Sequence, residues 1–310
     1  MILTKNNFLK YFFLSGIFLL NSITLSFAQD DLMQMLEEET SAVKNRDFTQ
    51  ATFKGTRIIN GQSVENPAKG VLQALISHRF GTISSGAYNL FGLDAATIRL
   101  GFDYGISNHL TVGIGRSTVN KAFDGYLKCK LLRQSKGNVK MPVTVVGYFN
   151  TTINTAPKST QDLPLDLTSR LIYTYQLMIA RKFSERLSLQ VSPTFLHRNL
   201  VATRNDQHDI WALGFAGRFK LSRRISLCSE YYYLLPGYTS DNFSDSFAVG
   251  FDIETGGHVF QVHVTNSAGM IESQFIPSTT DNWSKGDIRI GFNISRVFTL
   301  CKSKNSNQSW

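Results

Sequence analysis

Apolar and polar side chains alternate along the segment from Lys285 to Phe298, close to the end of the chain. Its even positions from Ile288 to Phe298 are apolar except for Arg296, and its odd positions from Asp287 to Ser295 are polar or glycine. Side chains of a β-strand point alternately to the two faces of a sheet, so this strand would have one oily and one polar face. It could be an edge strand of a soluble sheet. Its aromatic end near the chain terminus favours the closing strand of a transmembrane barrel.

Segments of similar length and pattern recur from Val71 onward, and in one of them Ile98, Leu100 and Phe102 alternate with Arg99 and Gly101. Charged groups in a soluble β core would be very costly, so the pattern indicates an apolar exterior and a polar interior. The twelve segments that we count are 71–82, 95–105, 109–117, 123–133, 141–152, 168–183, 186–196, 208–221, 224–235, 245–254, 258–266 and 285–298.

The connections between these segments alternate between short and long. Outer-membrane barrels have short periplasmic turns and longer outer loops, which predicts an even strand count with both termini in the periplasm. The predicted fold class is therefore all-β: a closed antiparallel up-and-down transmembrane β-barrel of about twelve strands, with a short N-terminal helical and hairpin extension. Ten or fourteen strands stay open as alternatives, because segments 118–122 and 141–152 are ambiguous.

The first 28 residues have the pattern of a secretory signal peptide. Lys5 and Lys10 precede an apolar run over 11–20, and Ser26-Phe27-Ala28 supplies the small residues of a cleavage site. A transmembrane anchor is the alternative, but the run is short for one. No later run reaches 18 apolar residues, so the sequence predicts export to the bacterial outer membrane.

Residues 29–70 are predicted to form a periplasmic N-terminal segment ahead of the barrel at 71–298. The stretch 29–48 is acidic, with helical spacing of apolar residues, and Asn60-Gly61 is a strong turn dipeptide. The resulting small hairpin could sit under or inside the barrel mouth. Residues 299–310 form a polar C-terminal tail.

Composition excludes some functions. The chain has 32 basic and 23 acidic residues, a net charge of +9, without a basic patch of the kind that nucleic-acid binding needs. Cys129, Cys228 and Cys301 are odd in number and widely spaced, so neither a metal motif nor a disulfide framework is expected, and no cofactor is predicted. The first two are predicted to face lipid.

No catalytic motif is visible, and we predict that the protein is not an enzyme. The histidines form no H-E-x-x-H pattern and there is no G-x-S-x-G elbow. His78 is the one histidine assigned to the lipid face, and no partner for a surface hydrolase is visible beside it.

Charged residues recur at the positions predicted to face the lumen. Two explanations fit them: a salt-bridged interior that holds the barrel rigid, or a pore with weak anion preference, because basic rings favour anions. The lumen-facing candidates are Arg79, Arg99, Asp103, Lys128, Lys130, Arg170, Arg218, Lys220, Glu230, Asp252, Glu254, His263 and Arg289.

Several motifs appear in a fixed order along the chain. They are Thr56-Arg57-Ile58-Ile59-Asn60-Gly61, Ile76-Ser77-His78-Arg79-Phe80-Gly81, Ile98-Arg99-Leu100-Gly101 and Asp124-Gly125-Tyr126-Leu127-Lys128. With these motifs the chain resembles an uncharacterised family of membrane-bound β-barrel proteins typical of Bacteroidetes. The resemblance implies an outer-membrane barrel of unknown activity and supplies no catalytic residues. The polar tail after Phe298 departs from the usual aromatic end of such barrels.

Three functions remain open. The first is a passive pore for small polar or anionic solutes. The second is a non-conducting structural or partner-binding barrel, with residues 29–70 as a docking arm, and the third is a barrel enzyme acting on lipids. The expected partners are outer-membrane lipid, the barrel-assembly machinery and a periplasmic partner of the N-terminal segment, and the expected state is a monomer.

Overall fold

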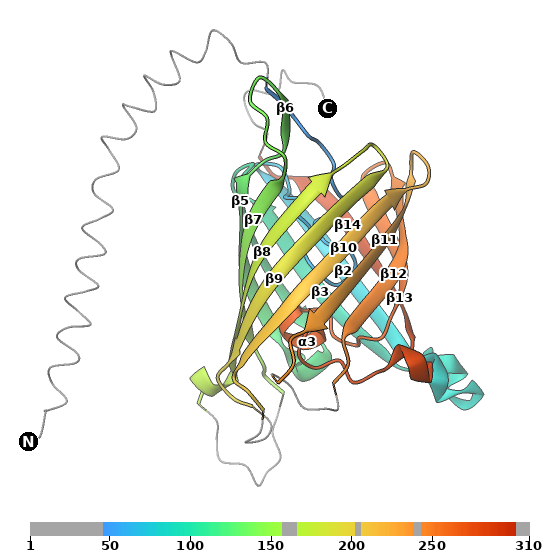
Figure 1. Cartoon of the computed structure of the whole chain (residues 1–310). Helices are drawn as coiled ribbons and strands as arrows, with labels where there is room; N and C mark the ends of the chain where they lie inside the picture. Colours follow the sequence, from blue (N-terminus) through green and yellow to red (C-terminus); the bar gives the residue numbers. More distant parts are fainter. Residues whose placement is uncertain (1–45, 157–165, 202–205, 238–242, 302–310) are drawn as a thin grey trace, which may run out of the picture. The chain divides into compact units, whose positions relative to one another are not determined.

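Twelve strands hydrogen-bond side by side in a ring (Figure 1). Every neighbouring pair is antiparallel, and the last strand pairs with the first, so the sheet has no free edge. The ring confirms the predicted closed twelve-stranded barrel. Its strands are β2 (Val71–Thr82), β3 (Ala96–Gly105), β4 (Leu110–Ser117), β5 (Phe123–Leu132), β7 (Thr144–Ile153), β8 (Leu171–Lys182), β9 (Leu187–Arg198), β10 (Asp209–Lys220), β11 (Ile225–Leu234), β12 (Ser246–Thr255), β13 (His258–Thr265) and β14 (Arg289–Thr299).

The computed structural model describes residues 46–156, 166–201, 206–237 and 243–301. The predicted signal peptide, almost all of the predicted acidic helical stretch and most of the polar tail lie outside the described residues. Short strands β1 (Arg46–Phe48) and β6 (Ser135–Gly137) pair with each other, and residues 46–47 with 136–140 group as a separate compact unit.

Short helical turns occupy several connections. They are η3 (Ile83–Ser85), η4 (Ala87–Gly92), η5 (Val119–Lys121), η6 (Thr168–Arg170), α3 (Glu272–Phe275) and η7 (Trp283–Lys285). None of the helices that the structure describes has the length and apolar content needed to cross a bilayer.

The strand faces sort by polarity as the alternation predicts. On β3, Leu100 and Phe102 are about half exposed, whereas Arg99 and Asp103 on the other face are fully buried. Soluble monomers rarely expose contiguous apolar patches above a few hundred square ångströms, so an oily outer surface of this extent requires a hydrocarbon environment. Other strands contribute outward apolar side chains in the same way: Ile76, Ile114, Leu127, Leu177, Leu189, Trp211, Phe215, Phe251 and Val262.

One facing prediction is wrong. Cys228 does not face lipid: it is 1% exposed, and its thiol donates to Asp252 Oδ2 at 3.2 Å. Cys228 is two residues from Glu230 on β11, so the alternation of the strand puts both side chains on the inner face.

The lumen and its plug as the candidate functional site

Residues 52–65 lie inside the ring of strands, and we call them the lumen plug. From Thr56 to Val64 every residue is buried, although the segment contains no strand or helix. Its contacts reach strands on several sides of the ring, including β2, β9, β11, β13 and β14. The hairpin around Asn60-Gly61, for which a place under or inside the barrel mouth was predicted, therefore lies inside the barrel.

The plug is a loop closed at its base and turned at its tip. Glu65 Oε1 accepts hydrogen bonds from the backbone N–H of Thr52 at 2.7 Å and of Phe53 at 3.3 Å, which joins the two ends. Arg57 and Gln62 form a single antiparallel bridge, so the predicted Asn60-Gly61 turn lies at the tip. The loop thus has a compact shape of its own within the lumen.

Side chains of the barrel wall satisfy the plug's backbone carbonyls. A segment without regular structure must find partners for its buried peptide groups, and here the wall supplies them in place of a strand ladder. Five wall side chains each donate a hydrogen bond to a plug carbonyl oxygen: Gln261 to that of Ile58 at 2.6 Å, Asn293 to that of Ile59 at 2.9 Å, Gln190 to that of Gln62 at 2.8 Å, Arg218 to that of Thr52 at 3.1 Å and Lys128 to that of Thr56 at 3.4 Å.

Glu230 on β11 binds the plug tip. Its carboxylate accepts from the backbone N–H groups of Ile59 at 3.2 Å, Asn60 at 2.8 Å and Gly61 at 3.1 Å. A Cβ built on Gly61 would lie 2.1 Å from the hydroxyl of Tyr232, so a larger residue here would have to displace the Tyr232 side chain. One carboxylate and one close approach therefore fix the tip of the plug.

Apolar contacts add to the polar ones. Four plug residues belong to one buried cluster with inward-facing side chains of the wall, which removes their surface from water. The cluster contains Phe53, Ile58, Ile59 and Val64 of the plug with Tyr126, Val146, Tyr148, Met178, Ala180, Cys228 and Ala248 of the wall.

A second segment enters the lumen from the connection between β13 and β14. We call residues 266–276 the inserted loop, and all four residues of its helix α3 are buried. Gln274 contacts Ser117 on β4, and Ser273 contacts Thr152 on β7. Phe275 meets the ring of Tyr232 on β11, 5.0 Å between centroids. Contacts to well-separated strands place this loop inside the ring, where Figure 1 draws α3.

The plug and the inserted loop meet at Arg57. Its guanidinium lies 3.6 Å from the carboxylate of Glu272, and both side chains are at most 3% exposed. Tyr148 of the wall donates to the same carboxylate at 2.9 Å. The two segments therefore form a continuous filling of the lumen in this conformation.

The predicted lumen-facing residues take three kinds of position. Arg79, Asp103, Lys128, Arg218 and Glu230 are at most 4% exposed and bond to the plug. Three more are buried without bonding to the plug: Arg99 donates to Asp124, Asp252 accepts from Gln261, and the ring of His263 has no hydrogen-bond partner among the described residues. Nearer the strand ends, four residues are half-buried: Lys130, Arg170, Lys220 and Arg289. Glu254, also near a strand end, pairs with Lys54 of the plug.

Sequence reasoning missed Asp124, which is the partner of Arg99. The Nε of Arg99 donates to Asp124 Oδ1 at 3.0 Å, and both side chains are fully buried. The missed signal was parity, because Asp124 shares the inward face of β5 with Lys128. The amides Gln190, Gln261 and Asn293 were missed because uncharged inward residues were not counted as candidates.

His78 lies on the outer face among aromatic side chains. Its ring stacks on Phe292 with 4.8 Å between centroids and meets Phe80 edge-on at 4.4 Å. Neither neighbour offers a nucleophile or a proton acceptor, so this geometry gives no support to a surface hydrolase.

Taken together, a closed ring of strands, an oily exterior and a polar, filled interior define a membrane β-barrel with an internal plug. The chain belongs to the Membrane bound beta barrel domain family (DUF5777), whose family model matches residues 53–298. The match begins within the plug, so the plug is part of the family's domain. The Bacteroidetes affiliation stays a prediction.

Solved structures similar to this chain include the NanC porin, at 10% identity and a TM-score of 0.46 over 74% of this chain and all of that one. The KdgM porin matches at 9% identity and a TM-score of 0.44, over 74% of this chain and 99% of that one. The COG4313 outer membrane channel from Pseudomonas putida F1 matches at 12% identity and a TM-score of 0.44, over 75% of this chain and 96% of that one. A search of curated proteins found no match. Likeness at this level says nothing about a solute.

Proposed function

We propose that the protein is an outer-membrane pore for small polar solutes that is closed at rest by its own plug. The observation that supports this most directly is how the wall holds the plug: through side chains that donate to backbone carbonyls, rather than through strand pairing. Such contacts can be exchanged one by one for water, whereas removal of a paired strand would open the sheet.

The charge distribution also supports a lumen built around a removable segment. Among the described wall charges that are less than 5% exposed, only Arg99 and Asp124 form an ion pair with each other. Arg79, Lys128 and Arg218 instead donate to the plug. Once the plug leaves, these cations and the carboxylate of Glu230 would line an aqueous passage.

We propose polar solutes without a strong preference for anions. The wall side chains below 5% exposure balance, with four positive (Arg79, Arg99, Lys128, Arg218) and four negative (Asp103, Asp124, Glu230, Asp252). An anion-selective ring would need an excess of basic groups at one level. The lumen-facing candidates predicted from the sequence contain eight basic and four acidic residues, but some of the basic ones, such as Arg170 and Arg289, lie near the strand ends.

A non-conducting barrel is the second candidate, and one observation favours it. The inserted loop packs an apolar cluster against the wall, with Phe275 and Ile276 fully buried among Leu196, Ile210 and Tyr232. A filling of this kind would hold the barrel rigid. In that case displacement of the plug alone would not open a passage.

Planar-bilayer recordings separate the two candidates. The full chain and a variant without residues 29–66 are purified in detergent, and their folding is checked by the heat-dependent shift in gel mobility. A closed pore predicts a silent full chain and stepwise conductance from the shortened one. Silence of both folded proteins would identify the non-conducting barrel, and steady conductance of the full chain would show that the plug does not close it.

A further inference from the structure

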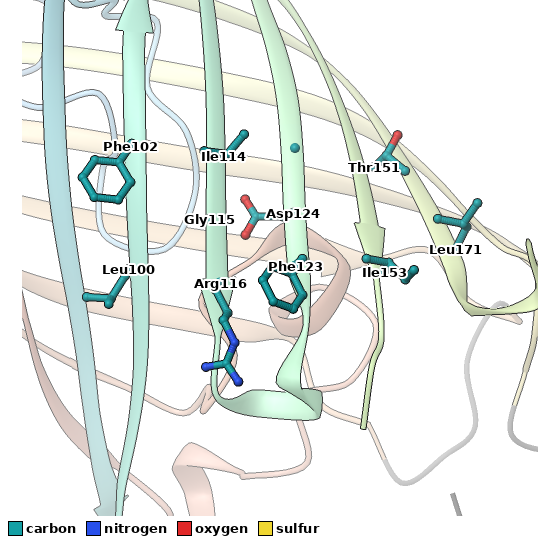
Figure 2. A pocket seen from close by; sticks show the side chains of 11 residues that line it. Leu100, Phe102, Ile114, Gly115, Arg116, Phe123, Asp124, Thr151, Ile153 and Leu171 are labelled. Carbon is teal, nitrogen blue, oxygen red and sulfur yellow. The ribbon is translucent and has the colours of Figure 1, made fainter. Parts of the chain in front are cut away.

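A hollow of about 580 Å³ lies on the outer surface of the barrel, apart from the lumen (Figure 2). This size is within the range of small-ligand sites. Its lining comes from four adjacent strands, β3, β4, β5 and β7, and from the first residue of β8. The apolar residues that surround it are Leu100, Phe102, Ile114, Phe123, Ile153 and Leu171.

Small residues create the hollow at the centre of this patch. Gly125 pairs directly with Thr151 on one side and with Ile114 on the other. A Cβ built on Gly125 would meet no atom within 4 Å, so its outer side is open. Large side chains stand on both flanks at the same level, with Phe102 beyond Ile114 and Tyr173 beyond Thr151. The result is a groove with oily walls on a surface that faces hydrocarbon.

Arg116 stands at one end of the groove (Figure 2). Its guanidinium carbon lies 5.5 Å from the centre of the Phe123 ring, a cation–π distance that directs the side chain along the wall. Within the described ranges Arg116 forms no ion pair, and the nearest carboxylate of the lining, Asp124, points inward to Arg99. An unpaired arginine at a membrane interface attracts a phosphate group, which it can bind with two parallel hydrogen bonds.

The position along the strands indicates the leaflet. Phe123 is the first residue of β5 and Ile153 the last of β7, so the charged end of the groove lies at the barrel end with the longer connections. In an outer-membrane barrel that end faces outward.

We propose that this groove binds a phosphorylated acyl lipid of the outer leaflet, with one acyl chain over Gly125 and the phosphate on Arg116. Charge complementarity favours a lipid over a second copy of the chain, which would have to bring an acidic group to the same point. A second outer hollow, of about 490 Å³ and lined in part by Gly147, contains no charged residue and provides an internal comparison. The proposal is independent of whether the lumen conducts.

Native mass spectrometry tests the proposal with lipid A as the probe and dephosphorylated lipid A as its control. The full chain should retain lipid A, and Arg116→Gln should reduce retention at least tenfold. Gly125→Phe should reduce it similarly by filling the groove. Two matched variants should keep it: Arg296→Gln, which removes another arginine lying over a phenylalanine, 5.1 Å from the Phe298 ring, and Gly147→Phe in the uncharged hollow.

Equal retention of the two probes by the full chain would overturn the role of the phosphate. Retention unchanged in both Arg116→Gln and Gly125→Phe would overturn the site itself. A dimer that Gly125→Phe dissociates would show that a second copy, and not a lipid, occupies the groove. Arg116→Gln changes only an exposed side chain, so a folding failure of Gly125→Phe would leave the phosphate claim testable.

Discussion

Glu230 should decide how firmly the plug is held. In Glu230→Ala the backbone N–H groups of Ile59, Asn60 and Gly61 lose their acceptor. A buried donor left without a partner costs about 1–3 kcal/mol, so three such groups weaken the closed state by at least about 3 kcal/mol. The open fraction is the share of molecules whose plug has left the lumen. At 1.4 kcal/mol for each factor of ten, this fraction should rise on the order of a hundredfold.

Glu230→Gln should have an intermediate effect. An amide oxygen in the place of Oε2 still accepts from Ile59 and Gly61, and only the bond from Asn60 is lost. The expected cost is about 1–2 kcal/mol, which corresponds to a roughly 5- to 30-fold rise in the open fraction. The open fraction is therefore predicted to increase from wild type to Glu230→Gln to Glu230→Ala.

The open fraction can be measured in two ways: as open probability in single-channel recordings, and as the labelling rate of Ser63→Cys by a water-soluble maleimide in a background with the three native cysteines replaced by serine. Glu254→Gln serves as the matched control, since its carboxylate pairs with Lys54 of the plug but is 41% exposed. Exposed ion pairs contribute about 0–1 kcal/mol, so this variant should behave nearly as wild type. Folded Glu230→Ala that neither conducts nor labels faster than wild type would refute the reasoning.

Three further outcomes are expected. Gly61→Ala should raise the open probability, because its new Cβ would meet the Tyr232 hydroxyl. Tyr232→Phe in the same chain should lower the open probability again in part, and an equal open probability with and without Tyr232→Phe would contradict this. Arg99→Ala should strongly lower the unfolding temperature in detergent, because it leaves the buried carboxylate of Asp124 without its partner at a cost of about 3–5 kcal/mol. An additional Asp124→Ala should recover much of the lost stability. Glu272→Gln should loosen the plug from the inserted loop and speed labelling at Ser63→Cys without a comparable loss of barrel stability; unchanged labelling would show that this contact does not hold the plug.

The barrel itself could be predicted from the sequence because period-two alternation both defines a strand and assigns its faces. The predicted segment 208–221 and the observed β10, Asp209–Lys220, differ by a single residue at each end. Cys228 was assigned to the lipid face although it shares the parity of Glu230, which was assigned to the lumen, and the structure buries both.

The turn at Asn60-Gly61 could be predicted, but the place of the plug stayed open between under and inside the barrel mouth, because a segment without periodicity gives no signal of where it lies. One sequence feature is nevertheless explained by the plug. Segment 141–152 is apolar on both faces, which left its register uncertain. The structure supplies the reason, since Val146 and Tyr148 face inward and pack against apolar residues of the plug. The inserted loop has a similar feature in Met270-Ile271, an apolar pair within a long connection.

The most direct test of the plugged lumen is a cross-link formed in intact outer membranes. Asn60 at the plug tip lies beside Thr265 on β13, with Nδ2 and Oγ1 3.4 Å apart. With Asn60→Cys and Thr265→Cys in a chain free of its native cysteines, a short bis-methanethiosulfonate linker should join the two peptides, as detected by mass spectrometry. The linkage should form slowly, because both positions are buried in the closed lumen. Absence of the linked peptide, together with rapid labelling of Asn60→Cys by a water-soluble reagent, would contradict a lumen closed by residues 52–65.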